Sequence, residues 1–329
     1  MSAALRVTIL TEAGRGPGLG HFRRCVALGT AAADLGGLVR VLVAGNVPPE
    51  PPRDGRLEFE PCDWIKGGVA ALDNAVADVV IVDSYTATAS FLARLAARVP
   101  CAVLIDDLSD RPTPVDVVVN GGFHATRLTY RGKPDTIYLL GPQYVLLDPA
   151  FAAPLSRASA GVVRRVLVTL GGDAPSERFE TVIDVVGRVS PDTQLDVVVG
   201  PFTTWNPADR DRVRIHRGLS SLRARMLTAD LAITAGGMTL YECLASGVPI
   251  VALTIADNQR PNVASLGAAG LLVDGEPSLE PAVRRLVEDA GLRATMSRRG
   301  RELVDGAGAR RVASEIQRVA AARGVAGRA

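Results

Sequence analysis

The feature that most constrains the fold is a repeated pattern of a short apolar run, a glycine-rich turn and a segment of helical periodicity. Residues 232–251 show it most clearly: an apolar run, the pair Gly236-Gly237, two helical turns, and a second apolar run after Gly247 and Pro249. Wholly apolar short runs are typical of strands buried on both faces, and strands that alternate with helices build parallel sheets. The pattern therefore predicts an α/β protein.

The same alternation recurs along the chain. In the first half it predicts strands at residues 6–10, 39–43, 79–82, 102–105 and 117–119, and helices at 22–35 and 88–98. In the second half it predicts strands at 165–170, 195–199, 231–234 and 249–253, and helices from Ser176, over 219–227 and, as three segments, over about 280–322. Each half by itself reads as a doubly wound, Rossmann-like unit.

A change in composition separates the two halves. Between residues 148 and 163 the alternation gives way to Asp-Pro, Ala-Pro and small residues, which favours a linker. The chain has 329 residues, enough for two domains that each bury a core. We therefore expect domains at 1–155 and 156–329 that face a cleft, with the last helix packing back on the first domain.

Composition excludes several classes of function. The net charge is +2 and no basic stripe is present, so we do not expect a nucleic-acid partner. The four cysteines are widely spaced and form no C-x-x-C pair, which is typical of reduced core residues and not of disulfides or a metal site. No apolar segment is long enough to span a membrane, and the N-terminus lacks a signal pattern. We expect a cytoplasmic protein without metal, cofactor or stable membrane insertion.

The turn at Gly236-Gly237 is a candidate phosphate site. Glycine lets the backbone approach a ligand closely, and the following helix directs unpaired N–H groups towards it. Thr239 adds a hydroxyl, and Glu242, one helical turn further, lies where the ribose of a bound nucleotide diphosphate would be. The alternative is an ordinary connection between a strand and a helix. A second glycine pair, Gly171-Gly172, also lies between a strand and a helix, so two turns could hold one pyrophosphate.

The first half offers polar residues of its own at predicted strand ends. A glycine loop at residues 14–20 leads into His21, but its spacing departs from the dinucleotide fingerprint. Asp83-Ser84-Tyr85 and Asp106-Asp107 follow two further strands, at the sheet edge where α/β proteins place their sites. Adjacent carboxylates on a strand face opposite ways, so we do not read Asp106-Asp107 as a metal site. His124 and His216 have no partner motif and read as surface or loop residues.

Six ordered blocks between about residues 5 and 270 resemble a known family. The blocks are Gly18-Leu19-Gly20-His21 with Arg24-Cys25, Val82-Asp83-Ser84-Tyr85, Ile105-Asp106-Asp107-Leu108, Gly141-Pro142-Gln143-Tyr144, Leu170-Gly171-Gly172-Asp173 and Ala256-Asp257-Asn258-Gln259. The second half is similar to the donor-nucleotide half of GT-B enzymes such as the N-acetylglucosaminyltransferase that completes the peptidoglycan lipid precursor. The closer resemblance is to the UDP-sugar hydrolase of pseudaminic acid biosynthesis and its spore-coat polysaccharide relatives.

The resemblance implies a GT-B fold and a role for individual residues. His21 would be the general base, which suits an imidazole because this group changes charge near neutral pH. Tyr85 and Asn258 would lie around the sugar and the water, with Asp83 and Ser84 as support. The remaining residues implied to bind the substrate are Gly20, Arg24, Gly171, Gly172, Met226 (under the uracil, or else in the core), Gly236, Gly237, Thr239, Glu242 and Gln259.

The implied reaction is inverting hydrolysis of a UDP-sugar, similar to UDP-2,4-diacetamido-2,4,6-trideoxy-altropyranose, to UDP and free sugar. An inverting glycosyltransferase with the same donor half and the same His21 is the alternative. A nucleotide-sugar-binding protein without catalysis is a third, and the intact His21 speaks against it. Two departures from the family pattern, Pro17 and Asp148, leave the identity of the sugar open. The sequence does not reveal the nucleotide base of the substrate or the oligomeric state.

Overall fold

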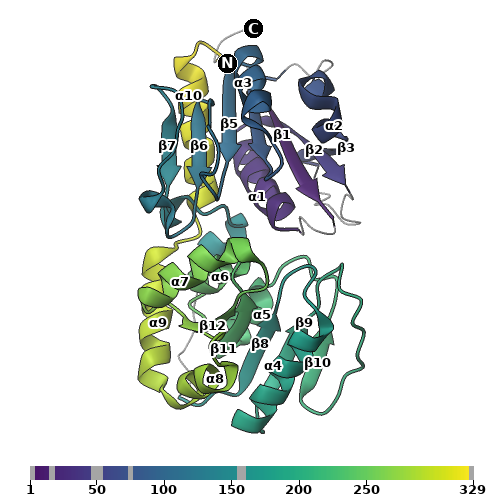
Figure 1. Cartoon of the computed structure of the whole chain (residues 1–329), viewed down its shortest axis with the longest axis vertical. Coiled ribbons are helices and arrows are strands. Elements are labelled where there is room, and N and C mark those ends of the chain that lie inside the picture. Colours follow the sequence, from purple (N-terminus) through teal and green to yellow (C-terminus); the bar gives the residue numbers. More distant parts are fainter. Residues whose placement is uncertain (1–3, 15–18, 46–54, 73–76, 154–160, 326–329) are drawn as a thin grey trace. The chain divides into compact units, whose positions relative to one another are not determined.

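The computed structural model describes residues 4–14, 19–45, 55–72, 77–153 and 161–325 (Figure 1). The chain divides into two compact units, unit 1 (Met1–Pro149 with Gly306–Ala329) and unit 2 (Ala150–Asp305). The expected boundary between residues 155 and 156 falls in the segment 154–160, which lies outside the described residues. Each unit is considered by itself below.

Unit 1 is built on a seven-stranded sheet with the order β3-β2-β1-β4-β5-β6-β7, and all of its strand pairs are parallel. The strands are β1 (Arg6–Ala13), β2 (Leu38–Gly45), β3 (Leu57–Pro61), β4 (Val79–Asp83), β5 (Cys101–Ile105), β6 (Val117–Asn120) and β7 (Ile137–Leu140). The helices are α1 (Gly20–Asp34), α2 (Trp64–Gly67), α3 (Ala89–Arg98) and the C-terminal α10 (Gly308–Ala322). The parallel α/β architecture predicted for this half is confirmed.

Alternation along the strands divides the core of unit 1 into two layers. On β1, Val7 and Ile9 pack on the side of α1 and α10, whereas Leu10 packs on the side of α2 and α3. This follows from the two-residue period of a strand, which sends successive side chains to opposite faces. The C-terminal helix α10 buries Val312 and Ile316 in the first layer, so the end of the chain completes the core of its beginning (Figure 1).

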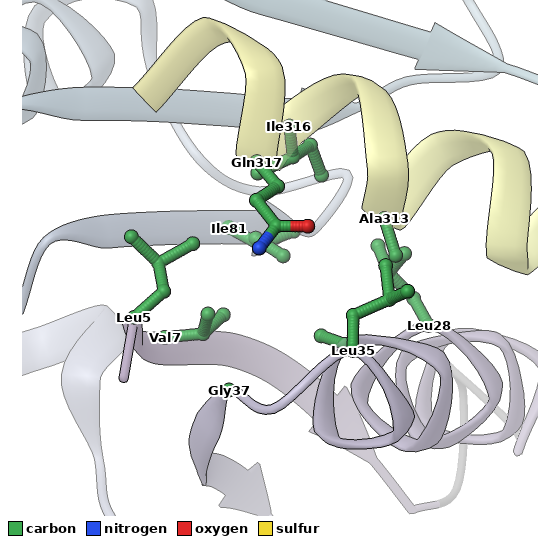
Figure 2. A pocket seen from close by; sticks show the side chains of 10 residues that line it. Leu5, Val7, Leu28, Leu35, Gly37, Ile81, Ala313, Ile316 and Gln317 are labelled. Carbon is green, nitrogen blue, oxygen red and sulfur yellow. The ribbon is translucent and has the colours of Figure 1, made fainter. Parts of the chain in front are cut away.

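A small apolar hollow of about 20 Å³ lies between α1 and α10, with room for roughly one water molecule. Its walls include Leu5 before β1, Leu28 of α1, and Ala313, Ile316 and Gln317 of α10 (Figure 2).

Unit 2 contains a six-stranded parallel sheet with the order β10-β9-β8-β11-β12-β13. Its strands are β8 (Arg165–Thr169), β9 (Gln194–Val198), β10 (Val213–His216), β11 (Leu231–Ala235), β12 (Ile250–Leu253) and β13 (Val273–Asp274). Its helices are α4 (Ser176–Val189), α5 (Arg223–Thr228), α6 (Met238–Ala245), α7 (Arg260–Ala268), α8 (Leu279–Glu288) and α9 (Ala290–Leu303). The helix expected over 219–227 begins four residues later than predicted.

Both sheets reverse their strand order at one point. In unit 1 this switch point lies between β1 and β4, and in unit 2 between β8 and β11. Helices leave such neighbouring strands in opposite directions, so the carboxyl edge there is left open for a ligand. At these two points lie His21, at the start of α1, and Asp83, at the end of β4, in unit 1, and the two glycine pairs in unit 2.

Among the residues that the structure describes, no helix is both long enough and apolar enough to cross a membrane.

Candidate active site

At the switch point of unit 1, a histidine is held by a buried carboxylate. His21 is the second residue of α1, and Asp83 is the last residue of β4. Because β1 leads into α1 and pairs with β4, the fold brings together two side chains 62 positions apart. Nδ1 of His21 lies 2.6 Å from Oδ1 of Asp83, and the Asp83 side chain is fully buried. Gly20 precedes His21, and no atom of the described residues would lie within 4 Å of a Cβ at that position.

Arg24, one helical turn after His21, binds both oxygens of Asp83. Its Nε donates to Oδ2 and its Nη2 to Oδ1, each at 2.6 Å. Burial alone would raise the pKa of Asp83, but the charge of Arg24, the His21 ring and their hydrogen bonds outweigh it and hold this pKa well below its usual range. Asp83 is therefore ionised at neutral pH.

The ionised state of Asp83 determines which nitrogen of the His21 imidazole carries the hydrogen. A carboxylate can only accept hydrogen bonds, so Nδ1 of His21 carries the hydrogen and Nε2 carries the lone pair. Nε2 makes no hydrogen bond with any residue that the structure describes. In this arrangement the Asp83 carboxylate sets the tautomer of the His21 imidazole, and the lone pair on Nε2 can accept a proton.

Tyr85 and Asp107 complete this group of side chains. The Tyr85 ring stands edge-on to the His21 ring, with centroids 4.4 Å apart and planes at 82°. Its hydroxyl donates to Oδ2 of Asp107 at 2.8 Å, and Nη1 of Arg24 donates to both oxygens of Asp107 at 2.9 and 2.8 Å. Sequence reasoning did not assign Asp107 to the site, although an acid directly after the strand next to β4 was a signal for it.

Ser84 does not take the supporting role implied for it beside Asp83, because its hydroxyl bonds elsewhere. Its hydroxyl donates to Glu12 at the end of β1 and accepts from the backbone N–H groups of Thr86 and Ala87 at 2.9 and 3.1 Å. Ser84 therefore shapes the turn that follows β4. Asp106 likewise points away from Asp107, accepting from the Ser109 N–H at 2.7 Å.

The turn at Gly171-Gly172 follows β8 at the switch point of unit 2. Gly171 has φ +94°, a backbone conformation that favours glycine, and the space beside its Cα is open. A Cβ on Gly200 would lie 2.2 Å from the Gly171 carbonyl oxygen, so the loop after β9 packs directly on this turn.

The turn at Gly236-Gly237 follows β11, beside the first turn. The side-chain carbonyl of Gln259 accepts from the N–H groups of Gly236 and Ile255, at 3.1 and 3.0 Å. A Cβ on Gly236 would meet Val263 at 2.6 Å and Gln259 at 2.8 Å, whereas one on Gly237 would have its nearest neighbour at 3.9 Å. Gly236 is thus required by internal packing, and Gly237 by contrast borders open space. The structure places Gln259 as the residue that holds this turn.

The other predicted residues of unit 2 lie around that turn. Thr239 and Glu242 are half-buried in the first two turns of α6, and Asn258 is exposed in the short helix Asp257–Gln259. Met226 is fully buried in α5, with its sulfur 3.7 Å from the Ser246 hydroxyl, which is a core position.

One sequence-based assignment was wrong. His216 does not lie unpartnered on a surface loop: it is the last residue of β10, and its Nε2 lies 2.6 Å from Oδ1 of the buried Asp196. The partner comes from the neighbouring strand β9, and pairing between strands is not visible in local sequence.

In the described part of the chain, no group of three or more His, Cys, Asp or Glu residues is arranged to hold a metal ion.

Comparisons with known proteins find relatives of this chain at modest sequence identity. No family model matches the sequence. The spore coat polysaccharide biosynthesis protein SpsG of Bacillus subtilis is 28% identical over 258 residues, covering 73% of this chain and 76% of that protein. A Helicobacter pylori protein named pseudaminic acid cytidylyltransferase and UDP-2,4-diacetamido-2,4,6-trideoxy-beta-L-altropyranose hydrolase is 24% identical over 187 residues, which are 55% of this chain and 35% of that protein.

Solved structures identify the fold. The glycotransferase of kitacinnamycin matches with a TM-score of 0.64 and 18% identity, covering 97% of this chain and 100% of its own. The Streptomyces sp. SF2575 glycosyltransferase SsfS6, solved with thymidine diphosphate, matches with a TM-score of 0.62 and 17% identity over 94% of this chain and 99% of its own. The resemblance predicted from the sequence is thereby confirmed: the chain has the GT-B glycosyltransferase fold and is similar, at modest identity, to SpsG and to the bifunctional Helicobacter pylori protein.

Proposed function

We propose that this chain hydrolyses a UDP-sugar at the anomeric carbon with inversion, releasing UDP and a free sugar. The observation that carries the proposal is the His21–Asp83 pair, in which an ionised, buried carboxylate leaves Nε2 of the imidazole available as a base. The hydrolase activity in the name of the Helicobacter pylori relative supports water as the acceptor. A substrate of the altropyranose type named there is the first to test.

The proposed step balances as a single displacement. Nε2 of His21 takes a proton from water as the water oxygen bonds to the anomeric carbon. The bond from that carbon to the UDP oxygen breaks, and UDP leaves with the electron pair. One displacement at one carbon inverts its configuration. Asp83 stabilises the imidazolium that forms, while Arg24 keeps Asp83 ionised.

Unit 2 is proposed to hold the nucleotide. The N–H groups at Gly237 and the start of α6 present a partial positive charge that suits a diphosphate, and Gly171 offers a second open backbone turn. Glu242 is proposed to accept the ribose hydroxyls, since a carboxylate binds donors well. Thr239 adds a hydroxyl near the phosphates, and Asn258 and Tyr85 are proposed to border the sugar.

An inverting glycosyltransferase is the second candidate. The fold is that of glycosyltransferases, and the name of SpsG refers to polysaccharide biosynthesis. The same base would then deprotonate a sugar or lipid hydroxyl in place of water. A binding protein without catalysis has less support, because the base and its carboxylate are both in place.

The test is UDP release from a panel of UDP-sugars, without acceptor, by the parent protein, His21→Ala and the control His124→Ala. The proposal predicts release by the parent and the control, and a loss of at least about 100-fold in His21→Ala. A protein that binds UDP-sugars but releases UDP only after an acceptor is added would instead be a transferase. Equal release by His21→Ala would refute the assigned base.

A further inference from the structure

The guanidinium of Arg24 is shared between two carboxylates. Its Nε and Nη2 bind Asp83 at 2.6 Å, and its Nη1 binds Asp107 at 2.8 and 2.9 Å. The side chain of Arg24 is 8% exposed and that of Asp107 is 25% exposed, so these contacts are largely screened from water. Nη2 of Arg24 also lies 3.3 Å from Nδ1 of His21. Asp107 therefore contacts two neighbours of the base, Arg24 and the Tyr85 hydroxyl, but not the imidazole itself.

Counting charges shows what the second carboxylate does. Arg24 and Asp83 alone would form a neutral pair, in which the charge of Arg24 offsets part of the stabilisation that Asp83 gives to a positive imidazolium. With Asp107 the three groups carry one net negative charge, which becomes zero when His21 gains a proton. In a buried site such a single charge has a large effect, because the low dielectric strengthens it.

The other charged groups described on the neighbouring elements are paired elsewhere or lie at the surface. Glu12 on β1 accepts from Ser84 and Thr86, and Arg111 pairs with Asp106 and Asp110. Arg23 on α1 is exposed.

On α1 the neighbouring Cys25 thiol is neutral, because burial and then the charge of Asp83 hold its pKa well above the usual value. From β4 and the residues that follow it come Asp83 itself and the Tyr85 ring, whose hydroxyl is a donor to Asp107. From the end of β5, Asp106 turns towards Ser109 and Arg111.

We propose that Asp107 is a positioning residue for the reaction: by sharing Arg24 with Asp83 and anchoring Tyr85, it leaves the His21 site one negative charge that favours protonation of the base. The inference rests on the proposed role of His21. It assigns a function to a carboxylate that touches neither the imidazole nor, in this account, the substrate.

The experiment is the pH dependence of kcat/KM for UDP release, measured for the parent, Asp107→Asn and Tyr85→Phe. Without the Asp107 charge the base protonates less readily, so the acidic limb of the profile should move about one pH unit lower, with a plateau roughly tenfold lower. Tyr85→Phe keeps both carboxylates, so the acidic limb of its pH profile should lie at the same pH as that of the parent, whatever the rate of the variant.

A second pair of variants separates charge from fold. Asp107→Glu and Asp107→Gln have similar size and differ in charge, so only Asp107→Glu should restore the parent limb. An unchanged limb in Asp107→Asn and Asp107→Gln, with His21→Ala inactive, overturns the inference and spares the proposed function. A parent protein that releases no UDP with or without acceptor overturns the proposed function itself, and the inference with it.

Discussion

At the scale of single residues, Asp83 links the candidate site to the stability of the fold. The pKa of Asp83 lies below its value in an unfolded chain, about 3.9, so its contribution to stability is complete above that pH and is lost as the pH falls through the folded-state pKa. Asp83→Asn should remove this acid-sensitive contribution and leave Arg24 without its full charge partner. We expect a loss of about 3 kcal/mol in the free energy of unfolding at pH 7.

Urea unfolding of the parent and Asp83→Asn at pH 7 and at pH 3.5 measures this. The difference between the two proteins should shrink at the lower pH. A difference that is constant across this range would mean that Asp83 is not held ionised by Arg24 and His21.

Replacing Asp106 is expected to change the free energy of unfolding in the opposite direction to replacing Asp83. Burial, reinforced by the charges of Asp107 and Asp110, raises the pKa of Asp106 despite the Ser109 N–H and Arg111. Because the folded-state pKa lies above the unfolded one, the protonated form favours folding, and this stability is lost as the pH rises between the two values. Asp106→Asn keeps an acceptor for Ser109 and should gain about 0.5 kcal/mol or more at pH 7 by thermal unfolding. Asp211→Asn, at an exposed side chain of unit 2, is the control and should change little.

The sequence identified most groups of the candidate site but not how they are connected. A glycine loop before His21 and the residues after the strands pointed to the correct edges of both sheets. The shared guanidinium of Arg24, with Asp107 as its second partner, depends on the angle between α1 and two strands, and local sequence does not encode that angle. His216 was misjudged for the same reason, since Asp196 reaches it across a strand pair.

At the scale of elements, the two glycines of the turn before α6 are expected to be required for different reasons, Gly236 for packing and Gly237 for binding. Gly236→Ala would place a methyl group 2.6 Å from Val263, so we expect a loss of about 1–3 kcal/mol in stability. Gly237→Ala meets nothing nearer than 3.9 Å at φ −89°, so its stability should be unchanged while UDP affinity falls. Thermal unfolding and UDP titration calorimetry measure both effects. Equal UDP affinity in Gly237→Ala and the parent would argue against a phosphate at this turn.

Buried strands were predictable and edge strands were not. Central strands such as β4, β5 and β12 are largely apolar runs that stand out in the sequence. In contrast, β3 has only Leu57 buried and includes two glutamates and a proline, and β10 alternates with Arg214 and His216. Edge strands are covered on fewer sides, so their composition resembles that of loops and apolar periodicity cannot identify them.

At the scale of the molecule, the C-terminal helix belongs to the core of unit 1. Ile316 on α10 is buried among residues of α1 and the sheet, so Ile316→Ala should cost about 2–4 kcal/mol. Ser314→Ala, on the exposed side of the same helix, is the matched control with little expected change. Thermal unfolding of both variants is the measurement, and equal melting temperatures would contradict the packing described for α10.

The most direct test of the central claim is to follow UDP-sugars by proton NMR during reaction with the parent and with His21→Ala, in the absence of any acceptor. The account predicts that the parent releases free sugar whose first-formed anomer is inverted relative to the substrate, and that His21→Ala forms it at least about 100 times more slowly. Release of sugar with retained configuration, or at the same rate without His21, would contradict a displacement by water driven by the His21–Asp83 pair.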